Sequence, residues 1–423
     1  MNKDSFLKHW LIFADFKINS TLTDLYYFFK DNFRKVSFGW LLTFFSSFGQ
    51  TFLISLYVPE IVRDFQITEG TFGAIYAGCT VISSIVMLTV GHTVDHKPVK
   101  KVTAFTIFSL AFSSILLGFS YNIGLLFIAL IGLRLTGQGL MSHISMTVIS
   151  KYFDKNRGKA LSISSLGYSM GEAIFPVIIA LIIGWFDWRI AAIASGCALL
   201  LYLIRLKFTN LADFDKQLSG EGRPSTLSLL KDYKNVVFEK KFGIMMPASF
   251  MLSFTITAIF FYQYVFVADK NWSVQLYATF FTVYAATRFL FSLFGGMWVD
   301  KYTAKVLFRY FLIPLTLGIL PFAFMDSIIG ALIFLIMAGI TVGMSGTVQT
   351  ALIAEMYGTA KMGAIRSVFT MFMVLSTALG PLLVGFLIDL KIPFSTIMLI
   401  MFGLMTLICI NSLRIKNEKS LSH

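Results

Sequence analysis

Three ionisable side chains lie deep inside long apolar runs of the sequence, at Arg134, Glu172 and Arg288. A charge in such surroundings is costly, so each is a candidate for binding or transfer chemistry. A guanidinium presents a planar fork of N–H donors that suits a carboxylate or a phosphate, and a buried carboxyl group can exchange a proton near neutral pH. We therefore expect Arg288 to bind an anionic group of a substrate, and Glu172 and Arg134 to take part in proton coupling.

Each of these roles has a structural alternative. For Arg288 the alternative is a structural ion pair with Glu172, and for Glu172 it is a permanent ion pair with Arg134. His143 is a candidate proton relay, although a lone buried histidine is more often held by hydrogen bonds. Glu355, at the end of an apolar run, is either part of a gate or solvated.

Polar and aromatic side chains also gather in two other apolar runs. The run 38–58 contains Gln50, Thr51, Ser55 and Tyr57, and the run 243–268 contains Tyr262, Gln263 and Tyr264. Such groups fit a small polar solute, and we select Gln50, Tyr262 and Gln263 as substrate-binding candidates. The alternative is hydrogen bonding between helices or an aromatic belt at the membrane interface.

The chain that must position these residues is far more apolar than a soluble domain. Of its 423 residues, 57% are hydrophobic and 13% are charged, against about 25% charged in soluble domains. Runs of about 20 apolar residues span a bilayer as helices and are too long for barrel strands. The sequence predicts an all-α membrane protein with twelve transmembrane helices at 38–58, 71–94, 102–120, 123–149, 160–184, 188–206, 243–268, 274–299, 305–325, 327–354, 364–389 and 393–413.

Basic residues predict the orientation of these helices. Most of the 35 Lys and Arg residues fall on the side of the N-terminus, and the other side holds Arg63, Arg189, Lys270 and Lys391. Cytoplasmic loops of membrane proteins are rich in Lys and Arg. We therefore expect a multi-pass protein of the cytoplasmic (inner) membrane with both termini in the cytoplasm, and we assign the net charge of +13 to loops rather than to a nucleic-acid partner.

Polar segments divide the chain into regions. We expect a cytoplasmic leader at 1–37, a first six-helix bundle at 38–206, a cytoplasmic linker at 207–242, a second six-helix bundle at 243–413 and a tail at 414–423. The leader sequence Ser20–Lys35 is typical of an amphipathic surface helix. We expect it to be an anchor, with a regulatory or partner-binding role as the alternative.

An internal repeat relates the two bundles. Short signatures recur at an offset of 205 residues, which indicates duplication of a six-helix unit and hence pseudo-symmetric bundles. The pairs are Gly91 and Gly296, Asp95 and Asp300, Lys100 and Lys305, Tyr152 and Tyr357, Gly158 and Gly363, and Pro176 and Pro381.

Two of the repeated loops carry a recognisable motif. Residues Gly91 to Lys100 and Gly296 to Lys305 both resemble the G-x-x-x-D-x-x-x-x-[RK] loop of the Major Facilitator Superfamily, and Arg134-Leu-Thr-Gly-Gln-Gly is similar to its R-x-x-G-x-G pattern. Gly167, Gly171 and Pro176 give a loose form of its helix-5 pattern. His96-Lys-Pro replaces the usual Arg-x-Gly of the first loop, and the second loop also lacks that glycine, so we expect altered loop geometry in the same fold.

The resemblance implies a secondary transporter that works by alternating access. It implies that Asp95 meets the start of a helix near Gly363 and Arg366, and that Asp300 meets one near Gly158, which closes the cytoplasmic side in the outward-open state. The implied cytoplasmic gate is Gly91, Asp95, Lys100, Gly296, Asp300 and Lys305. Arg288 also resembles the anion-recognising arginine of the monocarboxylate and oxalate/formate carriers.

Other functions lack support in the sequence. Phosphate-loop, zinc-protease and nucleophile-elbow motifs are absent, so we expect no enzyme, no cofactor and no metal, and Cys79, Cys197 and Cys409 form no disulfide framework. We expect a monomer that contacts lipids and carries a small organic anion, with the proton as candidate coupling ion. The alternatives are efflux of drugs or siderophores, and a non-transporting membrane sensor.

Overall fold

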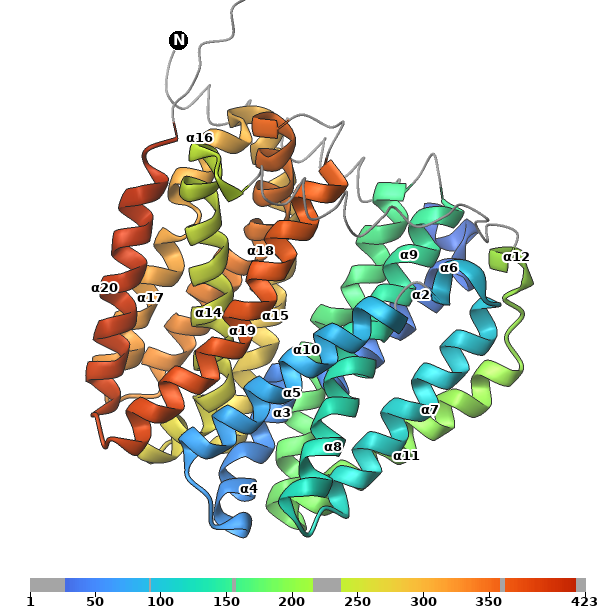
Figure 1. Cartoon of the computed structure of the whole chain (residues 1–423), viewed down its shortest axis with the longest axis horizontal. Helices are drawn as coiled ribbons and strands as arrows, with labels where there is room; N and C mark the ends of the chain where they lie inside the picture. Colours follow the sequence, from blue (N-terminus) through green and yellow to red (C-terminus); the bar gives the residue numbers. More distant parts are fainter. Residues whose placement is uncertain (1–26, 91–92, 154–156, 216–236, 358–361, 416–423) are drawn as a thin grey trace, which may run out of the picture.

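A computed structural model describes residues 27–90, 93–153, 157–215, 237–357 and 362–415 of the chain. Within these ranges the regular structure is helical and contains no strand. Figure 1 shows two bundles of helices side by side, as the duplicated apolar pattern predicts. Residues 20–26 of the predicted leader helix lie outside the described residues, whereas residues 27–35 are helical apart from a turn at Asn32. The role of the leader as an anchor or as a regulatory element stays a prediction.

The first bundle contains one broken helix followed by five long spans. Its elements are α2 (Phe33–Phe45), η1 (Ser46–Gly49), α3 (Thr51–Ile54), η2 (Ser55–Tyr57), α4 (Val58–Phe65), α5 (Glu69–Val90), α6 (Thr93–His96), α7 (Val99–Gly118), α8 (Ile123–Leu133), η3 (Arg134–Met141), α9 (Ser142–Tyr152), α10 (Arg157–Trp185) and α11 (Trp188–Lys207). The short α12 (Ala212–Asp215) begins the predicted linker.

The second bundle begins with a continuous helix instead of a broken one. Its elements are α14 (Lys240–Asp269), α15 (Val274–Tyr302), α16 (Ala304–Tyr310), α17 (Ile313–Phe324), α18 (Ile329–Tyr357), α19 (Met362–Asp389) and α20 (Phe394–Ser412). Within the described residues, eleven helices are long and apolar enough to cross a membrane, or up to twelve if the bent first pair is one span. Large apolar side chains such as Phe105, Phe108 and Leu201 lie exposed on the outside of the bundles, where a bilayer covers them.

The first span is broken at Gln50, where the sequence predicts a continuous helix. Its two parts, Phe33–Gly49 and Thr51–Phe65, meet at 41°, and Gln50 has an extended backbone with φ −84° and ψ 150°. The break brings Gly49 against Gly137 of η3, a π-helical segment. A Cβ atom on Gly137 would lie 2.6 Å from the Gly49 Cα, so this approach requires glycine at both positions.

The two bundles meet at one end of the molecule. We call it the α4 end, and the opposite end, where α11 ends and α14 begins, the linker end. Figure 1 shows the bundles converging at the α4 end and diverging toward the linker end. Between the bundles, α5 packs on α19 and α10 packs on α15. These two helix pairs therefore decide which residues face each other across the bundle interface.

Candidate functional site

An ion pair joins the bundles near the middle of the membrane-spanning region. The Arg288 guanidinium donates from Nη1 to Oε1 of Glu172. Arg288 is the middle residue of α15, and Glu172 lies 15 residues after the start of α10. At 1.5 Å per residue, both side chains are roughly 20 Å from either end of their helices.

The two members of this ion pair differ in their exposure and in their partners. The Glu172 side chain is 8% exposed and the Arg288 side chain 29%. Tyr168 and Tyr284 lie close enough to Arg288 to interact with it electrostatically. The second carboxylate oxygen of Glu172, Oε2, is buried and has no hydrogen-bond partner among the described residues. The geometry thus leaves one guanidinium accessible and one carboxylate oxygen unsatisfied.

Arg134 lies in a different environment. It is buried, donates from Nη1 to the Thr51 hydroxyl at 3.1 Å, and its guanidinium carbon lies 4.8 Å from the centre of the Tyr76 ring. The Thr51 and Tyr76 hydroxyls are 2.9 Å apart. In the described part of the chain Arg134 has no ion pair, and Glu172 pairs with Arg288 instead. Arg134 therefore brings an uncompensated cation to the broken first span.

The predicted substrate-binding residues of α14 lie at the interface between the bundles. Gln263 is fully buried and donates from Nε2 to the Ser55 hydroxyl at 2.7 Å, and its Oε1 accepts from the Tyr277 hydroxyl at 3.1 Å. The Tyr262 hydroxyl lies 2.7 Å from the Glu69 carbonyl oxygen and 3.0 Å from that of Pro381. Both side chains are engaged by protein groups in this conformation.

A carboxylate completes the contact at the α4 end. Asp389, the last residue of α19, accepts from the Gly70 backbone N–H at 3.1 Å and from the Thr68 hydroxyl at 2.7 Å. A Cβ atom on Gly385 would lie 2.8 Å from the Gly70 Cα, so α5 and α19 touch backbone to backbone. We name Thr68, Gly70, Tyr262, Gly385 and Asp389 the α4-end lock.

Two halves with a pair of charges between them are the arrangement expected for alternating access. The sequence profile of the Major Facilitator Superfamily matches the chain over residues 39–381 and over residues 245–420. The chain belongs to the Major Facilitator Superfamily. It is therefore a membrane transporter and not an enzyme, as the loop motifs of the sequence indicate.

A curated relative of this superfamily member is also a transporter by name. Among curated proteins, the chain is similar to the uncharacterized transporter YybO of Bacillus subtilis (strain 168), with 26% identity over 151 residues, which are 36% of this chain and 35% of YybO. The chain thus matches about a third of the length of that relative. The name of YybO does not specify a substrate.

Solved structures match over nearly the whole chain. A bacterial homologue of the human lysosomal transporter Spinster, in an inward-facing and occupied conformation, is 13% identical with a TM-score of 0.72, covering 89% of this chain and 95% of that one. The D323A mutant of the nucleoside transporter NupG is 14% identical with a TM-score of 0.74, covering 90% and 100%. At this identity the likeness shows the fold alone.

The residues of the superfamily loop motif are described in part. Gly91 and the side chains of Asp95 and Asp300 lie outside the described residues, so their gate role stays a prediction. Lys100 donates from Nζ to the Lys207 carbonyl oxygen at 2.8 Å, within its own bundle. A Cβ atom added to Gly296 would contact only the Thr347 methyl group among the described residues, at 3.9 Å.

Glu355 has a role in the second loop that the sequence does not reveal. Its carboxylate accepts from the backbone N–H groups of Ala304 at 2.8 Å and Lys305 at 3.3 Å. These are the first two residues of α16, whose N–H groups lack partners inside the helix. Glu355 therefore caps α16 and fixes the turn after α15.

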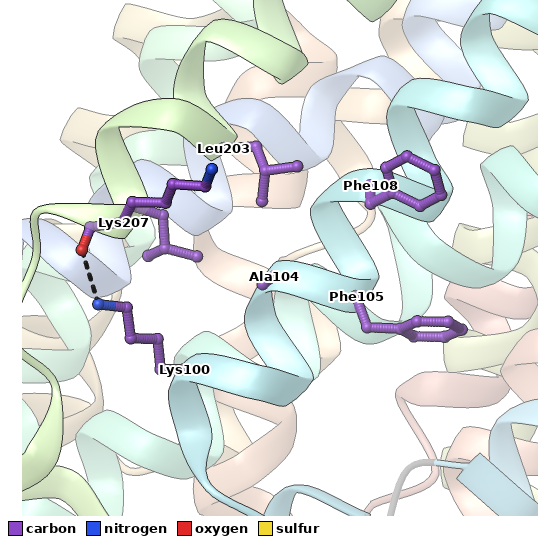
Figure 2. Close-up of a pocket in the computed structure, with 7 residues that line it drawn as sticks. Lys100, Ala104, Phe105, Phe108, Leu203 and Lys207 are labelled. Carbon is purple, nitrogen blue, oxygen red and sulfur yellow. Dashed lines mark hydrogen bonds between the residues drawn. The ribbon is translucent and has the colours of Figure 1, made fainter.

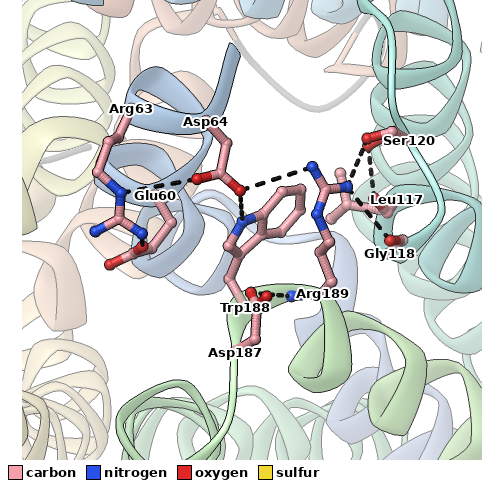
Figure 3. A network of polar contacts seen from close by, with 9 residues as sticks. All are labelled: Glu60, Arg63, Asp64, Leu117, Gly118, Ser120, Asp187, Trp188 and Arg189. Carbon is pink, nitrogen blue, oxygen red and sulfur yellow. Dashed lines mark hydrogen bonds and ion pairs between the residues drawn. The ribbon is translucent and has the colours of Figure 1, made fainter. Parts of the chain in front are cut away.

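A polar network that the sequence analysis missed anchors α4, the second part of the broken span. Figure 3 shows Asp64 of α4 between Trp188 and Arg189 of α11. Asp64 Oδ2 accepts from the Trp188 indole at 2.8 Å and pairs with Arg189 at 3.6 Å, and Arg189 also donates to the Ser120 carbonyl oxygen at 2.6 Å. The only signal in the sequence is the presence of loop charges, whose pairing requires knowledge of which helices are neighbours.

The remaining candidates have local partners or local packing. Gln50 marks the break of the first span, and Tyr57 packs on Trp188 with ring centres 6.4 Å apart. The Tyr264 hydroxyl is buried without a partner among the described residues. His143 lies in α9. Within the described residues there is no cluster of His, Cys, Asp and Glu that could hold a metal ion.

Proposed function

We propose that this superfamily member is a secondary active transporter that carries a small organic anion, with the proton as the coupled ion. The observation that carries the proposal is the Arg288–Glu172 pair, which connects the two bundles at mid-depth. Arg288 offers the planar fork that a carboxylate needs. Glu172 is the group already in the position that the substrate carboxylate would take.

Charge balance explains why a proton and an anion would move together. In the ion pair, Glu172 neutralises Arg288. When Glu172 takes up a proton, the guanidinium loses its partner, and a substrate anion restores neutrality. A buried unpaired charge is costly. The site is therefore favourable when it holds both the proton and the substrate anion, or when it holds neither. The Glu172 Oε2 atom is buried and has no hydrogen-bond partner among the described residues. This supports the proposal that the carboxylate accepts a proton.

We also infer which state of the transport cycle the structure represents. The α4-end lock holds the bundles together at the predicted extracellular side, whereas Figure 1 shows them diverging toward the predicted cytoplasmic side. We infer a state that is closed on the predicted extracellular side. In the outward-open state the lock opens, Tyr262 and Gln263 become available to substrate, and Asp95 and Asp300 close the cytoplasmic side. Arg134 then couples movement of the broken first span, through Thr51, to the rest of its bundle.

Transport by purified protein tests this proposal. The protein would be reconstituted in liposomes and offered a panel of small mono- and dicarboxylates with and without an inward proton gradient. We expect uptake of one class of carboxylate that rises with the gradient and is absent in Arg288→Ala. Gradient-independent uptake of lipophilic cations would favour drug efflux instead, and binding without any flux would favour a membrane sensor.

A further inference from the structure

A hollow of about 390 Å³ opens on the outer face of the first bundle, between α7 and α11. Figure 2 shows Lys100 and Lys207 together on one side of it and Phe105 and Phe108 on the other. We call it the lysine–phenylalanine groove. Its lining residues are Lys100, Ala104, Phe105, Phe108, Leu203, Leu206 and Lys207.

The groove has a polar end and an apolar wall. Lys100 is in the first turn of α7 and Lys207 is the last residue of α11, so the lysines mark the linker end. Phe105 and Phe108 lie five and eight residues further along α7, roughly 8 and 12 Å deeper. They are 64% and 53% exposed, so the described part of the chain leaves this wall largely uncovered.

Charge near the groove is strongly positive. Three further exposed cations, Lys97, Lys101 and Arg205, lie within three residues of Lys100 or Lys207 in the chain. The two described carboxylates nearby are already engaged: Asp215 accepts from the Val99 backbone N–H at 2.8 Å, and Asp213 pairs with Lys35 at 3.6 Å. An anion placed between Lys100 and Lys207 therefore meets several cations and little opposing charge.

We propose that the lysine–phenylalanine groove binds an anionic phospholipid of the cytoplasmic leaflet. The phosphate lies against the Lys100 and Lys207 ammonium groups, and one acyl chain lies along Ala104, Phe105 and Phe108. A soluble anion has no use for the apolar wall, and a zwitterionic lipid brings a second cation to a cationic end. The groove faces away from the Arg288–Glu172 pair, in α7 and α11, so the site is separate from the proposed transport site.

Lipid titrations of the purified full chain in a neutral detergent test the site. The probes are phosphatidylglycerol, phosphatidylcholine and water-soluble glycerol phosphate, followed by native mass spectrometry and by melting temperature. The variant is Lys100→Gln with Lys207→Gln. The matched control is Lys240→Gln with Arg414→Gln, which removes two exposed cations from the linker end of the second bundle.

We expect phosphatidylglycerol to bind more tightly than phosphatidylcholine, and the groove variant to lose roughly 30-fold in affinity, about 1 kcal/mol for each cation removed. The control variant keeps the affinity of the unmodified protein. An equal loss in both variants would mean general surface attraction and would overturn the proposal. Equal binding of glycerol phosphate would show a phosphate site without a lipid requirement and would also overturn the proposal.

A second variant tests the apolar wall while both lysines remain. Ala104→Phe fills the groove, so we expect weaker phosphatidylglycerol binding with an unchanged melting temperature in lipid-free detergent. That melting temperature also shows that each variant is folded. Full affinity for phosphatidylglycerol in Ala104→Phe would contradict an acyl chain in the groove.

Discussion

Arg288 of α15 and Glu172 of α10 form an ion pair that crosses from one bundle to the other at the middle of both helices. The pair connects the proposed substrate-binding cation to the proposed proton acceptor, and each charge compensates the other. Removing one member leaves its partner buried and unpaired, which destabilises proteins by about 3–5 kcal/mol when burial is complete. The consequences for stability and for transport can therefore be separated by experiment.

Stability should respond unequally to the two single substitutions. In Arg288→Ala, Glu172 can become neutral by taking up a proton, whereas in Glu172→Ala the guanidinium stays charged. We expect Glu172→Ala to lower the melting temperature more than Arg288→Ala does, and the double variant to recover most of the loss. Melting curves of the three variants, with Lys391→Ala as an exposed control, check this order.

Transport in the same variants decides the role of Arg288. Binding of anions should be lost in Arg288→Ala and in the double variant, even where stability recovers. Arg288→Lys keeps the charge but loses the bidentate fork, so we expect weakened binding. Anion transport that survives in the double variant would refute a substrate role and leave the pair purely structural.

The α4-end lock should weaken when a single methyl group is added at Gly385. Its Cβ would lie 2.8 Å from the Gly70 Cα, whereas a Cβ on Gly403 meets no atom within 4 Å. Overpacking costs about 1–3 kcal/mol, so Gly385→Ala should favour separation of α5 and α19, and Gly403→Ala should not. Labelling of a cysteine introduced at the buried Ser55, in a background without native cysteines, measures the opening. We expect labelling to be tenfold faster or more in Gly385→Ala, and equal rates in both variants would argue against the lock.

The orientation also has a direct test. The distribution of basic residues predicts that residues 1 and 423 and the linker 207–242 face the cytoplasm. Tags at these three places should resist impermeant labels added to intact cells and react after permeabilisation. Labelling of any one of them from outside would reverse the assignment of the α4-end lock to the extracellular side.

Much of the fold follows from the sequence because the signals are strong and local. Apolar length predicts the spans, and the repeat at an offset of 205 residues predicts two bundles. The break at Gln50 is different: it depends on Gly49 meeting Gly137, a contact between residues far apart in the chain. Periodicity carries no information about such a contact, so the first span looks continuous.

The site is less predictable than the fold for the same reason. Depth along the chain identifies Arg288, Glu172 and Arg134 as important, because charges in apolar runs are visible in the sequence. Which of them form a pair depends on α10 facing α15. The sequence offers Glu172 two arginine partners, and the packing selects Arg288. Likewise, Tyr262 and Gln263 are polar positions of interest in the sequence, but their engagement with Glu69 and Ser55 follows from how the bundles close.

The Glu172→Gln variant tests proton coupling most directly. The amide has the shape of a protonated carboxyl group and cannot release a proton, so Arg288 is left permanently available to the substrate. We expect anion binding that no longer weakens as pH rises, because loss of the proton can no longer restore the ion pair.

Exchange of labelled for unlabelled substrate should continue in Glu172→Gln, whereas accumulation driven by a proton gradient should be lost. Counterflow and gradient-driven uptake, measured side by side in proteoliposomes from pH 5 to pH 8, separate these activities. Gradient-driven accumulation that persists in Glu172→Gln would show that another group carries the proton.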